Sequence, residues 1–138
     1  MKRAMAVLGS LVLIGLLAPA PSAAQDALTK RDGRGPVAVT VALLESPAVG
    51  SPVRVRVALD THSVGLDGIT FGEAVAIRAP DGADVPPASV ERTSGGGHHR
   101  EAVLLFPAVR PAGTLVIVVK DVGGIAERLF SWELPPAR

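Results

Sequence analysis

The chain contains no cysteine and no tyrosine among its 138 residues, and its aromatic side chains are three phenylalanines and one tryptophan. The absence of cysteine excludes a disulfide framework, a thiolate metal site and a cysteine nucleophile. With so few rings, a core must consist mainly of Val, Leu, Ile and Ala. The length corresponds to one domain. The formal net charge of +1 argues against a protein that binds nucleic acid through bulk positive charge.

Residues 1–24 have the layout of a secretory signal peptide. Lys2 and Arg3 precede an uncharged apolar run over 4–17, which is shorter than the roughly 18 residues that a transmembrane helix needs. Small residues before an expected cut after Ala24 complete the pattern. We therefore expect a secreted or periplasmic protein with no membrane span after signal cleavage. Loss of the two basic residues changes the formal net charge from +1 to −1.

The polar segment 25–35 is expected to be a flexible lead-in, and residues 36–136 are expected to form one domain of short strands. In the run 53–60, valine and leucine alternate with arginine, alanine and aspartate. A strand places such aliphatic residues on one face, whereas a helix would mix arginines among them. Similar runs separated by Gly- and Pro-containing turns cover 37–44, 53–60, 69–78, 89–93, 102–106, 114–119 and 125–134. The pattern predicts an all-β fold, an antiparallel immunoglobulin-like β-sandwich of about 6–7 strands, with an up-and-down barrel as the alternative.

The three histidines lie in two short segments. Strand alternation places Asp60 and His62 on the same outward face, two residues apart. Three glycines precede His98 and His99 and allow backbone conformations that other residues avoid. We predict that the strand end carrying Asp60 meets this glycine loop, and that the loop geometry brings both adjacent imidazoles toward one centre.

One hypothesis is a divalent metal site. His62, His98 and His99 would be ligands, and Asp60 or Asp67 would supply an oxygen or orient an imidazole. Imidazole and carboxylate groups without thiolate suit Zn²⁺ or Cu²⁺. The chain would then be an exported metal-binding protein.

The alternative hypothesis is a non-enzymatic envelope scaffold or interaction domain, with an envelope protein as its partner. Its histidines would form a structural clasp of hydrogen bonds between two connections, and Thr61, Ser63 and Arg100 would be available as partners. The sequence leaves the oligomeric state open under either hypothesis.

We expect no enzymatic activity. Alternation sends His62 and Ser63 to opposite faces, and no strand–turn–helix elbow presents the serine as a nucleophile. A zinc hydrolase would need an open coordination position and a general base such as Glu73 or Glu101, and the chain length leaves little room for a substrate cleft.

Several segments together resemble an uncharacterised family of small exported prokaryotic β-domains. They are 59–63 (LDTHS), 96–100 (GGHHR), 103–107 (VLLFP) and 127–134 (ERLFSWEL). The resemblance covers most of residues 37–134 and implies a secreted or envelope-attached β-domain with no established activity. The chain departs from the family pattern at Gly65, where the family often has aspartate, and near Val90, where a tryptophan is missing.

Overall fold

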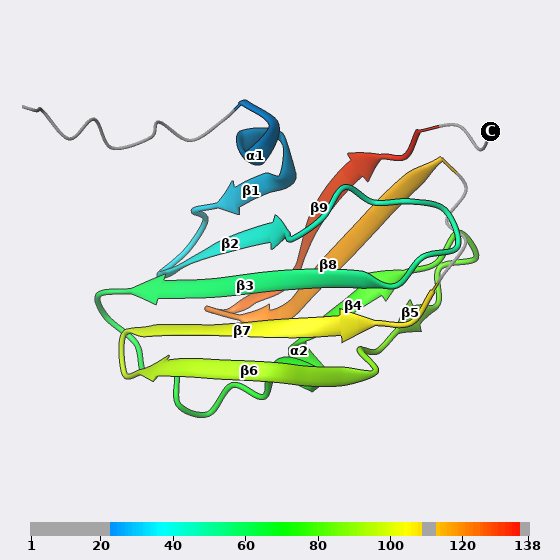
Figure 1. The fold of residues 1–138 in the computed structure, drawn as a ribbon. Helices are drawn as coiled ribbons and strands as arrows, with labels where there is room; N and C mark the ends of the chain where they lie inside the picture. The colour runs from blue at the N-terminus through cyan, green and yellow to red at the C-terminus, as the bar shows by residue number, and fades with distance from the viewer. Residues whose placement is uncertain (1–22, 109–112, 136–138) are drawn as a thin grey trace, which may run out of the picture.

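The computed structural model describes residues 23–108 and 113–135, and strands dominate this part of the chain (Figure 1). The expected signal peptide lies outside the described residues up to position 22, and Ala23 and Ala24 begin the first helix. Neither helix in the described ranges has the length and apolarity to span a lipid bilayer.

The described residues form two short helices and nine strands. They are α1 (Ala23–Leu28), β1 (Thr29–Asp32), β2 (Val37–Leu43), β3 (Val53–Thr61), α2 (Phe71–Ala74), β4 (Val75–Arg78), β5 (Asp84–Val85), β6 (Ser89–Gly96), β7 (His99–Phe106), β8 (Thr114–Val122) and β9 (Ile125–Glu133). The strands make two antiparallel sheets, ordered β1-β2-β3-β7-β6 and β5-β4-β8-β9. The predicted all-β architecture with two antiparallel sheets is confirmed.

One hydrophobic core joins the two sheets, and strand alternation determines which side chains enter it. On β3, Val55, Val57 and Leu59 are fully buried, whereas Arg54 and Arg56 between them are exposed. The other sheet contributes buried side chains such as Ile117 on β8. The sequence prediction for the run 53–60 is confirmed, because a side-chain period of two is a local property of an extended backbone.

Two segments differ from their sequence predictions. The expected flexible lead-in contains strand β1, which pairs with β2 from Thr29 opposite Ala42 to Asp32 opposite Val39. Its residues are polar and largely exposed, so they lack the apolar alternation that identifies a strand. The short strands β1 and β5 bring the number in the described ranges to nine, above the predicted six to seven.

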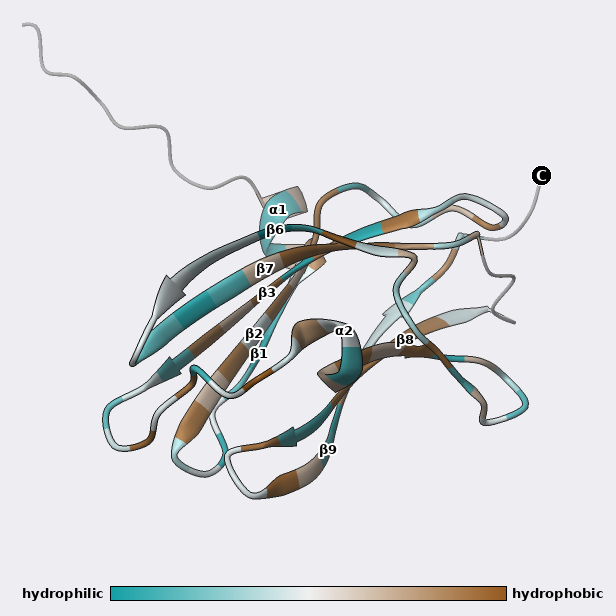
Figure 2. Cartoon of the chain, turned by 90° about the horizontal axis from the view of Figure 1, so that it is seen from below, coloured by the Kyte–Doolittle hydropathy of each residue, from teal (hydrophilic) through white to brown (hydrophobic). Residues whose placement is uncertain are grey.

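The predicted strand 69–78 is a strand only from Val75 onward, because the turn of helix α2 precedes it. The side chain of Phe71 in α2 is buried. The helix contacts β4 and β8 of one sheet and β6 of the other, and Figure 2 shows it between the two layers. A buried aromatic side chain thus anchors α2 between the two layers, an outcome that apolar periodicity in four residues does not reveal.

Arg128 on β9 is fully buried and connects β9 to strand β1. Its guanidinium lies 3.4 Å from a carboxylate oxygen of Asp32, and it donates to the carbonyls of Asp32 and Val122. The Nε atom has no hydrogen-bond partner among the described residues. Arg34 also pairs with Asp32 on the solvent side. The hydrogen bonds from Arg34, assisted by the charge of Arg128, lower the pKa of Asp32 to about 2.

Candidate functional site

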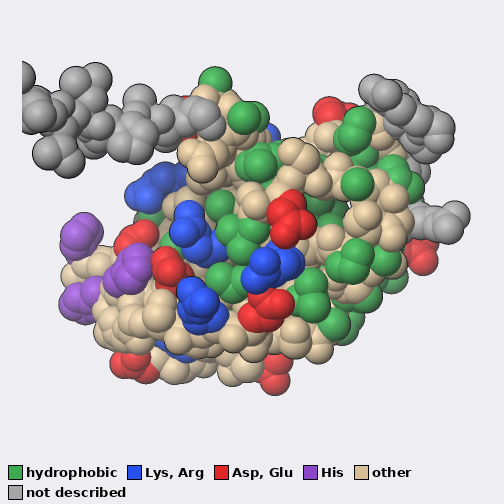
Figure 3. Space-filling model, viewed as in Figure 1, with side chains coloured by type: hydrophobic (Ala, Val, Ile, Leu, Met, Phe, Trp, Pro, Cys, Tyr) green, Lys and Arg blue, Asp and Glu red, His purple; other side chains and the backbone are tan. Residues whose placement is uncertain are grey.

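The two histidine segments meet at one end of the five-stranded sheet. Strands β3 and β7 pair with Asp60 opposite His99, and β6 and β7 pair with Gly96 opposite His99. The histidine side chains consequently gather at one end of the face shown in Figure 3. The predicted meeting of the strand end with the glycine segment is confirmed.

The glycine segment forms a β-hairpin, not an open loop. Gly97 and His98 are the two turn residues between Gly96 and His99. A positive φ of 62° at Gly97, the first turn residue, is typical of a type II′ hairpin turn. Gly95 also has a positive φ, and a Cβ atom there would collide with the carbonyl of His99. Glycine is therefore required at Gly95 for both conformational and steric reasons.

A set of hydrogen bonds attaches this turn to the loop that follows β3. The backbone N–H of Thr61 donates to the carbonyl of His98 at 3.0 Å, and that of Leu66 donates to the carbonyl of Gly97 at 3.0 Å. The N–H of Gly97 donates to the carboxylate of Asp67 at 3.0 Å. We call these bonds between residues 61–69 and 97–100 the hairpin clasp.

Arg100 provides the side-chain part of the hairpin clasp. One terminal nitrogen, Nη1, donates to the carbonyls of Leu66 and Ile69, each at 2.7 Å. The guanidinium carbon lies 5.1 Å from the centroid of the Phe71 ring, within the range of a cation–π interaction. A charged side chain that is half-buried thus satisfies two loop carbonyls and joins β7 to α2.

Thr61 stabilises the start of the same loop. Its hydroxyl donates to the carbonyl of Pro36 at 2.8 Å and accepts from the backbone N–H groups of Ser63 and Val64. The clasp hypothesis proposed Thr61 and Arg100 as partners of the imidazoles, but in the structure their side chains bond to main-chain groups instead. The bonds of the hairpin clasp itself come from main-chain groups, Asp67 and Arg100. The imidazoles do not supply them.

Of the three imidazoles, only that of His99 makes a hydrogen bond to another described residue. Its Nδ1 atom lies 2.5 Å from a carboxylate oxygen of Asp60, and its Nε2 atom lies 3.9 Å from Glu101. The hydrogen bond with Asp60 raises the pKa of His99 above its usual value. His62 and His98 are exposed.

The described residues offer no group of three or more His, Asp or Glu side chains placed to hold a metal ion. Both proposed oxygen ligands already have partners, because Asp60 binds His99 and Asp67 accepts from the Gly97 N–H. Binding of Zn²⁺ or Cu²⁺ therefore remains a prediction of the sequence. The structure relates His62 and His98 to this predicted metal site only by placing both at the same end of the sheet.

A metal titration tests that hypothesis. If the predicted site binds metal, purified, chelator-treated protein should show a saturable rise in thermal midpoint with stoichiometric Zn²⁺ or Cu²⁺, and His62→Ala should abolish that rise. A resident metal at one hundred times its Kd would stabilise the native state by about 2.7 kcal/mol, which a thermal melt detects readily. Absence of a rise, or a rise that His62→Ala leaves unchanged, would contradict the predicted site.

Arg128 and Asp67 have contacts in the structure that the sequence did not predict. Arg128 falls on the same strand face as Phe130 and Trp132, at a spacing of two, so alternation alone marks it as a buried charge. The metal hypothesis names Asp60 or Asp67 as an oxygen ligand or as a residue that orients an imidazole; in the structure the Asp67 carboxylate accepts a hydrogen bond from the N–H of Gly97, 30 positions away along the chain. No local sequence pattern predicts a hydrogen-bond partner that lies 30 positions away along the chain.

Together these features define a small protein of two antiparallel β-sheets with a hairpin fixed at one end by the hairpin clasp. No protein-family model, curated protein or solved structure matches the chain.

Proposed function

We propose that the chain is an exported, non-enzymatic interaction domain of the cell envelope that binds a partner protein through strand β6. All eight residues of β6 are exposed, and the strand lies at the edge of the five-stranded sheet. This exposure is the observation that carries the proposal. Immunoglobulin-like connectivity, cleavage after Ala24 and secretion to the envelope are parts of the same proposal.

Burial in the hydrophobic core does not explain why β6 is an ordered strand. A strand that buries no side chain gains little from the hydrophobic effect, yet fixing its backbone costs on the order of 1 kcal/mol per residue. The ladder with β7 and the hairpin clasp hold β6 in place. A strand held in this way offers a preformed row of main-chain donors and acceptors, as peptide binding by strand addition requires.

The hairpin register identifies which groups of β6 are free. In a two-residue hairpin, Gly96 and His99 exchange hydrogen bonds, and every second pair along an antiparallel ladder does the same. Ser94 therefore bonds to β7 through its opposite residue, Glu101. Arg92, opposite Val103, is the next bonded position. The N–H and C=O of Thr93, between Arg92 and Ser94, therefore point away from β7 and are available to a partner strand.

The edge is selective for its partner. A bulge interrupts the ladder between Val90 and Arg92, and bulges and edge charges discourage indiscriminate strand pairing. Glu91 forms an ion pair with Arg54 at 2.8 Å, which draws its carboxylate over the outer sheet face. Arg92 remains as the cationic group of the edge, so the proposed partner is an extended protein segment that carries a carboxylate beside it.

Site-specific photocrosslinking in the host cell tests this function. A crosslinking residue in place of Ser94 on β6 should give one discrete adduct, whereas the same residue in place of Ser131, an exposed position on β9 of the other sheet, should give none. Adding Thr93→Pro should abolish the adduct, because proline removes the outward N–H while leaving the bonded β7 positions intact.

Thr93→Val is the matched control, since it keeps the backbone donor and should keep the adduct. Circular dichroism and thermal midpoints should show that both variants fold. Absence of an adduct at Ser94, equal adducts from β6 and β9, or an adduct that survives Thr93→Pro in folded protein would each overturn strand addition at β6.

A further inference from the structure

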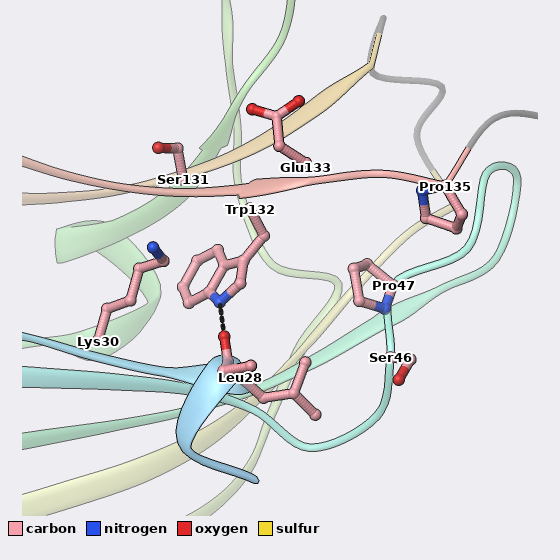
Figure 4. A pocket seen from close by; sticks show the side chains of 9 residues that line it. Leu28, Lys30, Ser46, Pro47, Ser131, Trp132, Glu133 and Pro135 are labelled. Carbon is pink, nitrogen blue, oxygen red and sulfur yellow. Dashed lines mark hydrogen bonds between the residues drawn. The ribbon is translucent and has the colours of Figure 1, made fainter. Parts of the chain in front are cut away.

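A separate cavity of about 600 Å³ opens between α1, the β2–β3 connection and the end of β9 (Figure 4). Its volume lies within the roughly 300–1,000 Å³ typical of sites for small molecules. Its lining residues are Ala27, Leu28, Lys30, Ser46, Pro47, Ser131, Trp132, Glu133 and Pro135. None of them belongs to β6 or to the hairpin clasp.

The inner wall of this cavity is apolar and held in place. The indole N–H of Trp132 donates to the carbonyl of Ala27 at 3.2 Å, which fixes the ring against α1. Leu28, Pro47 and Pro135 complete the apolar lining, and Figure 4 shows Leu28 and Trp132 facing the same space. Because the indole nitrogen of Trp132 is already hydrogen-bonded, this wall offers only carbon atoms to a bound molecule.

Lys30 supplies a positive charge beside the apolar wall of the cavity. Lys30 lines the cavity, its ammonium group lies 5.6 Å from the centroid of the Trp132 ring, and it forms no ion pair with another described residue. Glu133 and Ser131 are one position from Trp132 on β9, so strand alternation turns their side chains to the outer side of the strand, as Figure 4 shows. The ammonium group of Lys30 is thus the ionic group beside the apolar wall.

We propose that this cavity binds a small amphipathic anion, an aliphatic carboxylate in monomeric form. The aliphatic body lies against Trp132, Leu28 and Pro47, and the carboxylate accepts a charge-assisted hydrogen bond from Lys30. This activity is independent of partner binding at β6. Lys30 lies on β1, at the opposite edge of the five-stranded sheet from β6, and Trp132 lies on β9 of the other sheet.

Trp132 is the only tryptophan of the chain, so its fluorescence reports directly on this cavity. Titration with octanoate should change the Trp132 emission saturably. Octanol and octylamine, which have similar bodies without the negative charge, should bind about tenfold more weakly. Lys30→Met keeps the aliphatic stem of the exposed Lys30 and should weaken octanoate binding by about the same factor.

Arg56→Met, at an exposed arginine on β3 that does not line the cavity, removes a positive charge elsewhere; it is the matched control and should leave the octanoate titration unchanged. Three results would overturn the proposal. They are no saturable change with octanoate, equal affinity for octanoate and octylamine, and an emission change that occurs with anionic phospholipid vesicles but not with monomeric octanoate. The β6 crosslinking experiment can fail or succeed independently of all three.

Discussion

Replacing Asp32 with alanine should lower the free energy of unfolding by about 3 kcal/mol. The substitution removes the anionic partner of Arg128, whose side chain is 0% exposed, and removing one member of a buried pair typically costs about 3–5 kcal/mol. We place the effect at the lower end of this range because Arg128 keeps its bonds to two main-chain carbonyls. Urea unfolding followed by circular dichroism measures the change.

Two further variants separate burial from simple charge pairing. Arg34→Ala removes the solvent-side partner of Asp32, and its effect should be much smaller because the Arg34 side chain is 63% exposed. Asp32→Ala combined with Arg128→Met should recover much of the lost stability, since a packed apolar side chain replaces an uncompensated charge. A double variant no more stable than Asp32→Ala would contradict the assigned pair.

The stabilisation by Asp32 should also depend on pH. In the native state the pKa of Asp32 is lowered to about 2 from the usual 3.8. Between these two pH values the carboxylate stays ionised in the folded protein but binds a proton in the unfolded chain. The contribution is complete above about pH 4 and is lost as the pH falls toward 2. The stability gap between the parent and Asp32→Ala should therefore narrow over this window, whereas a constant gap would exclude a role for the carboxylate charge.

Replacing Arg100 with alanine should destabilise the protein by about 3 kcal/mol and loosen the end of the hairpin. The substitution leaves the carbonyls of Leu66 and Ile69 without their charged donor, and hydrogen bonds to charged groups contribute about 1.5–3 kcal/mol each. It also removes the contact with the Phe71 ring. Chemical denaturation measures the loss, and hydrogen exchange at Leu66 and Gly97 measures the local opening of the hairpin clasp.

Two other substitutions test whether imidazole groups stabilise this end of the five-stranded sheet. His62→Ala should leave stability unchanged, because the His62 side chain is exposed and the bonds of the hairpin clasp come from other groups. Arg56→Ala, at an exposed arginine on β3, should likewise be neutral and controls for the loss of a positive charge. A large loss of stability in His62→Ala would show that an imidazole holds the end of the sandwich, as the clasp hypothesis originally stated.

The sequence alone was sufficient for the strands that build the core. Alternation in 53–60 predicts the buried and exposed faces of β3 correctly, because side-chain direction in an extended chain depends only on neighbouring residues. It could not identify β1, whose polar residues are held by backbone pairing with β2. Nor could it identify α2, which depends on a place for Phe71 between the sheets.

The arrangement of the site required the tertiary structure. The sequence determined that His62, His98 and His99 lie in two segments, and strand pairing brings those segments together. A two-residue turn leaves His98 exposed, and the β3–β7 register places His99 beside Asp60. Arg128 and Asp32 are likewise 96 positions apart along the chain. Such contacts depend on register and layer packing, which arise from the whole chain, whereas the pattern that predicts a strand is contained in a few consecutive residues.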